Sequence, residues 1–271
     1  MGLLECVGYS LIAFGPSLAI FWVIIVGQPS RLVVFLVSSF FWLLSLLLSS
    51  IAWFMLNEFF DAPFAVCLFT SVGFQEFFRY LAFRTLRKAE EALNVVNLVG
   101  SEFDVALVRY HTTFACVSGL GFGATSAASA MLNVLADVGA GPGTVGFFGD
   151  HKSLDCIIYS ATAACFALLQ TLWSVVAFHA LLFRRYCVLL FVPAAHLFTS
   201  GVTILTGQAH QDVQYEAIPL AAAGVVLYMT AAVAFVVSGG TQRNLFSCLG
   251  GLLRNTGGSI NAPEAPERQQ L

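Results

Sequence analysis

Seven long apolar runs dominate this sequence, and they restrict what the chain can fold into. They lie near residues 3–26, 33–56, 64–83, 110–135, 155–182, 187–206 and 216–238. Each run is close to the roughly 20 residues that a helix needs to cross a bilayer. Polar or glycine-containing segments separate the runs. The pattern therefore predicts an all-α, polytopic membrane protein built as a bundle of seven transmembrane helices.

Composition excludes several classes of protein. Only 10% of the 271 residues are charged, and 58% are apolar. A soluble domain carries about 25% charged residues, so this chain has too few of them to coat a soluble surface. Its formal net charge of −3 provides no basic surface for DNA or RNA. An ordinary cytosolic enzyme, a disordered protein and a nucleic-acid binder are therefore excluded.

The distribution of lysine and arginine among the turns predicts the orientation of the bundle. One alternating set of turns and ends holds 11 of the 12 basic residues, namely Arg31, Arg79, Arg84, Arg87, Lys88, Arg109, Arg184, Arg185, Arg243, Arg254 and Arg268. The other set holds Lys152 alone. Because cytosolic loops collect positive charge, we expect a lumenal or extracellular N-terminus and a cytosolic C-terminus. Residues 1–245 then form the seven-span membrane domain, and residues 246–271 a largely disordered cytosolic tail.

A stripe of small residues marks the fourth run. Gly119, Gly123 and Ala127 recur at intervals of four, which places them on one face of a helix and allows another helix to approach closely. The neighbour is either a helix of the same bundle or a helix of a partner protein. We expect Gly123→Leu to disrupt the contact and Gly123→Ala to be milder.

Five polar side chains interrupt the apolar runs. Gln75, Glu76 and Arg79 lie in the third run, Gln170 in the fifth and His196 in the sixth. An unpaired charge at the centre of a bilayer costs roughly 2.5–3.5 kcal/mol, so such groups face the interior of a bundle. We therefore expect Glu76 and Arg79 to pair inside it. For His196 two interpretations remain open, a hydrogen bond between helices and a polar pocket or partner contact.

Motifs of known hydrolases are absent. The chain contains no G-x-S-x-G, no G-x-G-D and no H-E-x-x-H. No second intramembrane histidine is available beside His196 for a metal, so we expect neither a metal nor a cofactor. The seven cysteines are odd in number and lie mostly in apolar runs, which favours packing over disulfides. Whether Cys187 or Cys248 carries a lipid stays open.

Several short segments, taken in order, resemble one family. They are Ala13-Phe14-Gly15-Pro16, Phe40-Phe41-Trp42-Leu43 with Ser45-Leu46-Leu47-Leu48, Gln75-Glu76 with Phe78-Arg79, Val117-Ser118-Gly119-Leu120 with Phe122-Gly123, Asn133-Val134-Leu135-Ala136-Asp137, Gly141-Pro142-Gly143 with Gly149-Asp150, and His196-Leu197 with Thr199-Ser200-Gly201. Over about residues 1–245 the chain resembles the anterior pharynx-defective (Aph) subunits of gamma-secretase.

This resemblance implies a function. It implies a non-catalytic scaffold that assembles with nicastrin, presenilin and the presenilin enhancer subunit in the endoplasmic reticulum, Golgi and plasma membrane. Presenilin supplies the catalytic aspartates with which the complex cleaves type I membrane proteins such as Notch and amyloid precursor protein. The chain departs from the family at Ala127, where a third glycine is typical, and at Gln170, where a histidine is frequent. A titrating or metal-binding pair with His196 is therefore not expected.

Two other functions share the predicted topology. A seven-helix receptor would carry D-R-Y and N-P-x-x-Y patterns, and the chain has neither. A small transporter would show inverted repeats with broken helices, and no internal repeat is visible. A scaffold subunit is therefore favoured.

Overall fold

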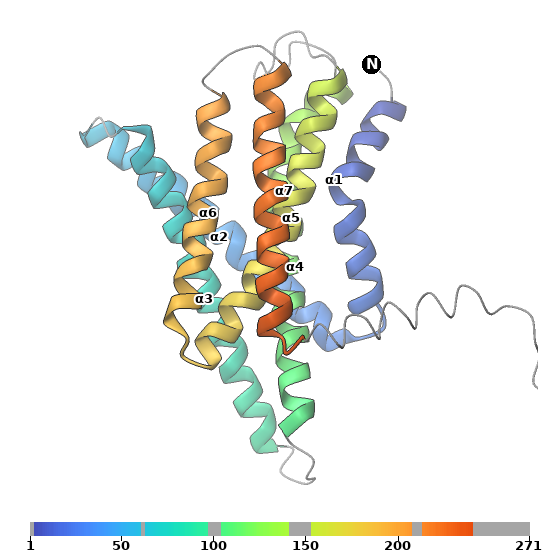
Figure 1. The fold of residues 1–271 in the computed structure, drawn as a ribbon, viewed down its shortest axis with the longest axis vertical. Helices are drawn as coiled ribbons and strands as arrows, with labels where there is room; N and C mark the ends of the chain where they lie inside the picture. Colours follow the sequence, from blue (N-terminus) through green and yellow to red (C-terminus); the bar gives the residue numbers. More distant parts are fainter. Residues whose placement is uncertain (1–2, 61–62, 97–103, 141–152, 208–212, 241–271) are drawn as a thin grey trace, which may run out of the picture.

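Long helices account for nearly all of the residues that the structure describes. The computed structural model describes residues 3–60, 63–96, 104–140, 153–207 and 213–240, and in these ranges it contains seven α-helices and no β-strand. The helices are α1 (Leu3–Ile24), α2 (Pro29–Phe60), α3 (Phe64–Val96), α4 (Asp104–Ala140), α5 (Ser153–Leu182), α6 (Tyr186–Gly207) and α7 (Val213–Val237) (Figure 1). The predicted all-α fold is confirmed, and each helix covers one of the predicted runs. The proposed tail at 246–271, Lys152 and Cys248 lie outside the described residues.

The helices run alternately in opposite directions. The N-terminal end of α1 lies at the upper end of the molecule, and α7 finishes at the lower end (Figure 1). The first and last described helices therefore have their outer ends at opposite ends of the bundle. Which end faces the cytosol stays a prediction.

Six of the described helices are long and apolar enough to cross a membrane, and α3 is not among them. Two features of α3 reduce its hydropathy. Its centre carries Gln75, Glu76 and Arg79, and its C-terminal half carries Arg84, Arg87 and Lys88. The helix continues to Val96, well beyond the predicted end at residue 83. A helix with polar groups at its centre can pack in a membrane bundle when these groups point toward the interior. The central polar groups of α3 do so, as described below.

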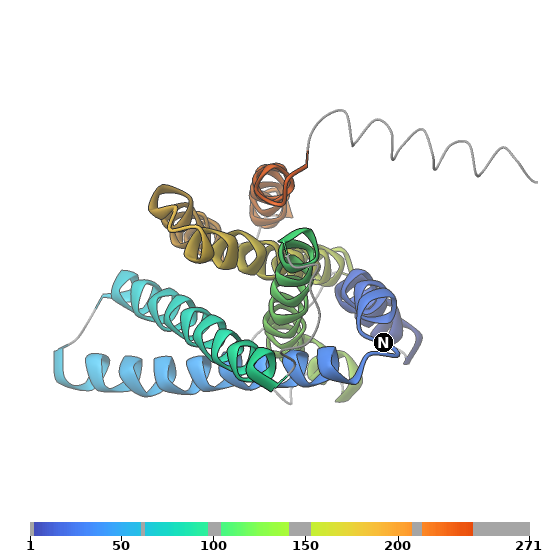
Figure 2. The same cartoon turned by 90° about the horizontal axis from the view of Figure 1, so that it is seen from below.

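The centre of the bundle is the pair α4 and α5. Their mutual contact is the most extensive in the molecule, and α2 and α1 also pack on α4 while α1, α6 and α7 pack on α5. Helix α3 lies between α2 and α6. Seen along the bundle, α2 and α3 form one flank and α6 and α7 the other, with α1 at the far edge of the α4–α5 pair (Figure 2). The helices that carry the polar residues, α3, α5 and α6, therefore meet on one side of the centre.

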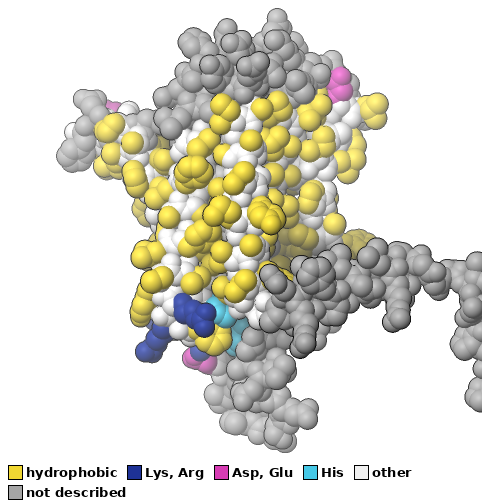
Figure 3. Space-filling view, viewed as in Figure 1, with side chains coloured by type: hydrophobic (Ala, Val, Ile, Leu, Met, Phe, Trp, Pro, Cys, Tyr) yellow, Lys and Arg dark blue, Asp and Glu magenta, His cyan; other side chains and the backbone are white. Residues whose placement is uncertain are grey.

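The surface is apolar and part of the interior is polar. Trp22, Val23 and Tyr228 are more than 70% exposed, whereas Arg79, Gln170 and His196 are at most 2% exposed. Hydrophobic side chains cover the middle of the molecule, and lysine and arginine gather at its lower end (Figure 3). Such a surface suits lipid, in which exposed apolar side chains carry no cost.

A tight turn joins α5 to α6. The backbone N–H of Arg185 donates to the carbonyl oxygen of Ala180 (2.8 Å), and Arg184 between them adopts a left-handed conformation with φ of 56°. This is the usual way to end a helix, but the left-handed position normally holds glycine. A side chain there costs about 1–2 kcal/mol. Arg184 therefore occupies a backbone conformation that is less favourable for arginine than for glycine.

Candidate functional site

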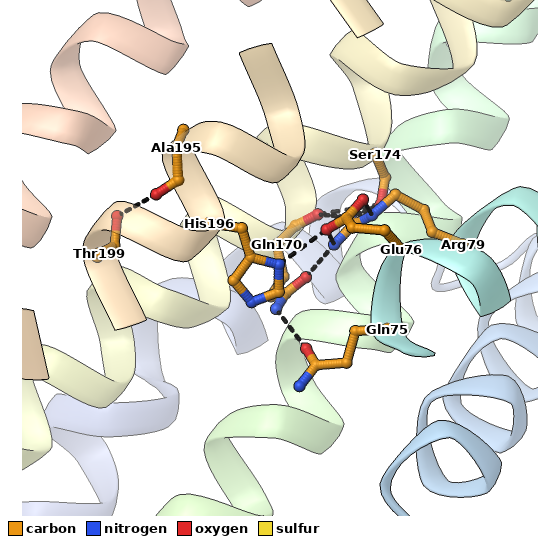
Figure 4. Close-up of polar contacts among 8 residues, drawn as sticks. All are labelled: Gln75, Glu76, Arg79, Gln170, Ser174, Ala195, His196 and Thr199. Carbon is orange, nitrogen blue, oxygen red and sulfur yellow. Dashed lines mark hydrogen bonds and ion pairs between the residues drawn. The ribbon is translucent and has the colours of Figure 1, made fainter. Parts of the chain in front are cut away.

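The five polar residues predicted from the sequence come together in one cluster, in which Arg79, Gln170 and His196 are buried and Gln75 and Glu76 are partly buried. Gln75, Glu76 and Arg79 project from α3, Gln170 from α5 and His196 from α6, and Ser174 of α5 joins them (Figure 4). The local reason is helical periodicity, because residues three or four apart share a helix face. Glu76 and Arg79 share one face of α3, and Gln170 and Ser174 share one face of α5. We call these six side chains the polar cluster.

Arg79 is the centre of the polar cluster. Its side chain points inward and is almost fully buried, so it does not reach back toward the membrane surface. Its Nε donates to Glu76 Oε2 (3.0 Å) and its Nη1 to Ser174 Oγ (2.6 Å), while Nη2 contacts Glu76 Oε1 (3.3 Å) and Gln170 Oε1. Nη1 also donates to the backbone oxygen of Gln170 (3.0 Å), which gives the five N–H groups of the guanidinium five acceptors.

An aromatic ring completes the surroundings of Arg79. The guanidinium carbon lies 5.3 Å from the centroid of the Phe122 ring on α4. A cation over a ring face is attracted by about 0.5–2 kcal/mol, more as it is desolvated. Arg79 therefore contacts α4 and α5 besides pairing with Glu76 on its own helix, and its charge is held where these three helices meet.

Glu76 joins Arg79 to His196. Its carboxylate takes the arginine fork on one side, and His196 Nδ1 lies 2.8 Å from Oε1 on the other. An ionised carboxylate only accepts hydrogen bonds, so Nδ1 of His196 carries the proton. The imidazole also stacks against the Trp173 indole, with centroids 4.6 Å apart and ring planes inclined by 30°. Of the two open interpretations, the structure provides His196 with a hydrogen bond between helices inside this chain.

The side-chain amide of Gln170 both accepts and donates a hydrogen bond. Its Oε1 accepts from Arg79, and its Nε2 donates to Gln75 Oε1 (3.3 Å). These two bonds determine which way the amide points. A glutamine thus links α5 to α3 at the position where the resemblance leads one to expect a histidine.

Ser174 and Trp173 were not predicted from the sequence. Ser174 lies one turn after Gln170 and its hydroxyl also donates to the Gln170 backbone oxygen (3.0 Å). The sequence signal that could have identified Ser174 is its position four residues after Gln170, which places both on one helix face. Trp173 is fully buried in an apolar run, and nothing in its sequence context marks it as the neighbour of a histidine.

The glycine stripe packs against a helix of the same chain. A Cβ atom at Gly119 would lie 2.6 Å from the Thr171 backbone oxygen, and one at Gly123 would collide with the Ala167 backbone oxygen. Both glycines therefore face α5 and bring its backbone into contact with that of α4. Ala127, one turn further along, is buried with its methyl group in place.

Gly121, which the sequence analysis did not single out, faces the opposite way. A Cβ atom there would lie 2.5 Å from the Phe35 backbone oxygen of α2. Ser38 and Ser118 share a hydrogen bond beside it (2.7 Å), and Ser39 donates to the Gly121 oxygen (3.2 Å). Helix α4 is therefore held closely on two faces.

The polar cluster can fix helices, and its chemistry is limited. Its one carboxylate is bonded to both Arg79 and His196, and no second acidic side chain belongs to the cluster. Across the described residues, no group of three or more histidine, cysteine, aspartate or glutamate side chains is arranged to hold a metal ion. What the arrangement does is join α3, α5 and α6 through hydrogen bonds between side chains.

Comparison with known proteins places the chain. A family model described as "Aph-1 protein" matches residues 4–241. Gamma-secretase subunit Aph-1 of Drosophila melanogaster is 38% identical over 249 residues, which cover 90% of this chain and 97% of the fly protein. Gamma-secretase subunit APH-1B of Homo sapiens is 36% identical over 251 residues, covering 89% and 91%. The plant protein named gamma-secretase subunit APH1-like, from Arabidopsis thaliana, is 30% identical over 213 residues, covering 76% and 82%. With a family model that matches almost the whole chain and relatives that align along nearly their full length, this chain belongs to the Aph-1 family.

Proposed function

We propose that this chain is a non-catalytic scaffold subunit of a gamma-secretase complex. The observation that carries the proposal is the length of the match, because proteins named as gamma-secretase subunits align with this chain over more than nine-tenths of their own sequence. The partners are presenilin, nicastrin and the presenilin enhancer subunit. The complex works in the endoplasmic reticulum, Golgi and plasma membrane on type I membrane proteins such as Notch and amyloid precursor protein.

The polar cluster supports a scaffold rather than a catalyst. Intramembrane aspartyl chemistry needs two carboxylates close enough to share a proton. The carboxylate of Glu76 instead lies between an arginine and a histidine and is bonded to both. Its role is to hold α3 against α5 and α6, and the shape of the bundle presented to partners depends on that contact.

Co-purification tests the proposal. The tagged chain is expressed in cells from which the endogenous Aph-1 proteins have been deleted, extracted in mild detergent and examined on native gels. We expect a large complex that contains presenilin, nicastrin and the enhancer subunit and that cleaves a Notch-derived stub. A chain that migrates alone and leaves cleavage unrestored would refute the proposal and favour a receptor or transporter.

A second measurement tests the absence of a catalytic role. Glu76→Gln removes the one acidic group of the polar cluster and keeps its size. We expect fewer assembled complexes, each with undiminished cleavage activity. If activity per assembled complex fell by orders of magnitude, Glu76 would belong to the chemistry and the subunit would not be a scaffold alone.

A further inference from the structure

A second feature of the molecule lies at its basic end and takes no part in the polar cluster. A depression of about 570 Å³ opens between α3 and the turn that joins α5 to α6. Its lining residues are Tyr80, Phe83, Arg84, Ala180, Leu181, Arg184, Tyr186 and Leu189. Figure 3 shows lysine and arginine side chains gathered at this end, directly below the apolar middle of the molecule. The depression therefore lies where an apolar surface gives way to a charged one.

The depression carries uncompensated positive charge. Arg84 and Arg184 are both exposed, and no acidic side chain is among the lining residues that the structure describes. Neither arginine forms an ion pair within the described ranges, whereas Arg87, one turn further along α3, lies 3.7 Å from Glu91. Two guanidinium groups facing one opening suit a phosphate, because the planar fork matches its oxygens.

The rim of the depression has the composition of a membrane–water boundary. Tyr80 and Tyr186 are 40% and 68% exposed, and the Arg84 guanidinium carbon lies 6.0 Å from the centroid of the Tyr80 ring. Tyrosine is enriched at the level of lipid headgroups. Leu189 of the rim and the exposed Leu190 beside it begin the apolar surface of α6. A phosphate with attached acyl chains fits this surface better than a free phosphate ion.

The backbone conformation of Arg184 also supports a binding role for its side chain. This residue holds the left-handed position that glycine occupies most easily, with φ of 56°. The turn itself needs no side chain there, since its closing bond runs from the Arg185 N–H to the Ala180 oxygen. An arginine at that position has a strained backbone. This is consistent with a role for its side chain in binding a ligand rather than in stabilising the fold.

We propose that this depression binds the headgroup of an anionic phospholipid, with the phosphate between Arg84 and Arg184 and the acyl chains along α6. The cytoplasmic leaflet is rich in such lipids, and the predicted topology places this end there. The interaction would anchor the α5–α6 turn to the membrane surface. It is independent of the gamma-secretase assignment and applies to the chain in any assembly.

Native mass spectrometry tests this proposal on the full chain, together with any proteins that co-purify with it. The delipidated protein is titrated with phosphatidylserine and with phosphatidylcholine of the same acyl chains. We expect tighter binding of phosphatidylserine, and a loss of about five-fold in its affinity for Arg184→Gly or Arg84→Gln and about 30-fold for the double variant. Arg184→Gly relieves the positive φ, so a loss of binding cannot be attributed to a failure to fold.

Arg87→Gln is the matched control. Arg87 carries the same charge as Arg84 and lies one turn further along α3, but it does not line the depression. Its affinity for phosphatidylserine should stay within about two-fold of the unmodified chain. An equal loss in this control would show a diffuse attraction and overturn the proposal. So would unchanged phosphatidylserine binding in the double variant. A double variant that keeps the lipid but loses a co-purifying protein would also overturn it and place that protein on the depression.

Discussion

Replacing Gly123 by alanine adds one methyl group where the backbones of α4 and α5 touch. The added Cβ would collide with the carbonyl oxygen of Ala167, a backbone atom that cannot move without moving α5. The sequence predicts that alanine here is milder than leucine; the structure shows that even the methyl group of alanine has no room at this position. The conflict is therefore present with the smallest side chain.

The magnitude follows from two opposing terms. Extra volume in a well-packed interior costs typically 1–3 kcal/mol, and the upper part of that range applies where the obstacle is backbone. Against this, alanine favours a helix over glycine by about 1 kcal/mol. We expect a net destabilisation of about 1–2 kcal/mol for Gly123→Ala, and a chain that fails to fold for Gly123→Leu, because the contact is internal.

Gly224→Ala provides the matched control. Gly224 lies in α7 with no atom within 4 Å of an added Cβ, so only the helix-propensity term remains and the chain should be slightly stabilised. Thermal unfolding of both variants in detergent, followed by size-exclusion chromatography, measures the difference. If Gly123→Ala unfolds at or above the temperature of the unmodified chain, as Gly224→Ala should, the close contact of α4 with α5 is refuted.

Three further predictions follow from the polar cluster and the topology. Glu76→Ala leaves Arg79 buried without its carboxylate, which costs about 3–5 kcal/mol, so pulse-chase should show faster turnover of the chain; an unchanged half-life would mean that Arg79 does not depend on the pair. At His196, asparagine can place an amide N–H where Nδ1 now lies, so His196→Asn should preserve presenilin association and cleavage better than His196→Ala, and equal loss in both would argue against the hydrogen bond to Glu76. Tags at the two termini in intact cells should be accessible from outside at the N-terminus alone, and an accessible C-terminal tag would reverse the proposed topology.

The polar cluster was foreseen in part. That Gln75, Glu76 and Arg79 would turn inward followed from the cost of charge in lipid, which any arrangement of the bundle must respect. That Gln170 and His196 would meet them depends on which helices are neighbours, and spacing within one run carries no such information. Ser174 was missed for the same reason, since a serine in an apolar helix is unremarkable until an arginine from another helix reaches it.

The small residues of α4 show the same division. Residues four apart lie on one helix face, so the pairing of Gly119 with Gly123 could be read from the sequence. Residues two apart point about 200° away from each other, so Gly121 faces a different neighbour, but its partner could not be named. The structure assigns α5 to the first pair and α2 to Gly121.

By itself, the sequence determined how many helices form, where each one begins and ends to within a few residues for most of them, and which charges must be buried. These properties depend on hydropathy and helical period, which are local along the chain. Tertiary structure alone decided that α5 is the helix shared by the glycine stripe and the polar cluster, and that Arg84 and Arg184, far apart in sequence, line one depression. Many arrangements of seven apolar helices satisfy the same local pattern, and this one is distinguished by the backbone contacts at Gly119, Gly121 and Gly123 and by the polar cluster.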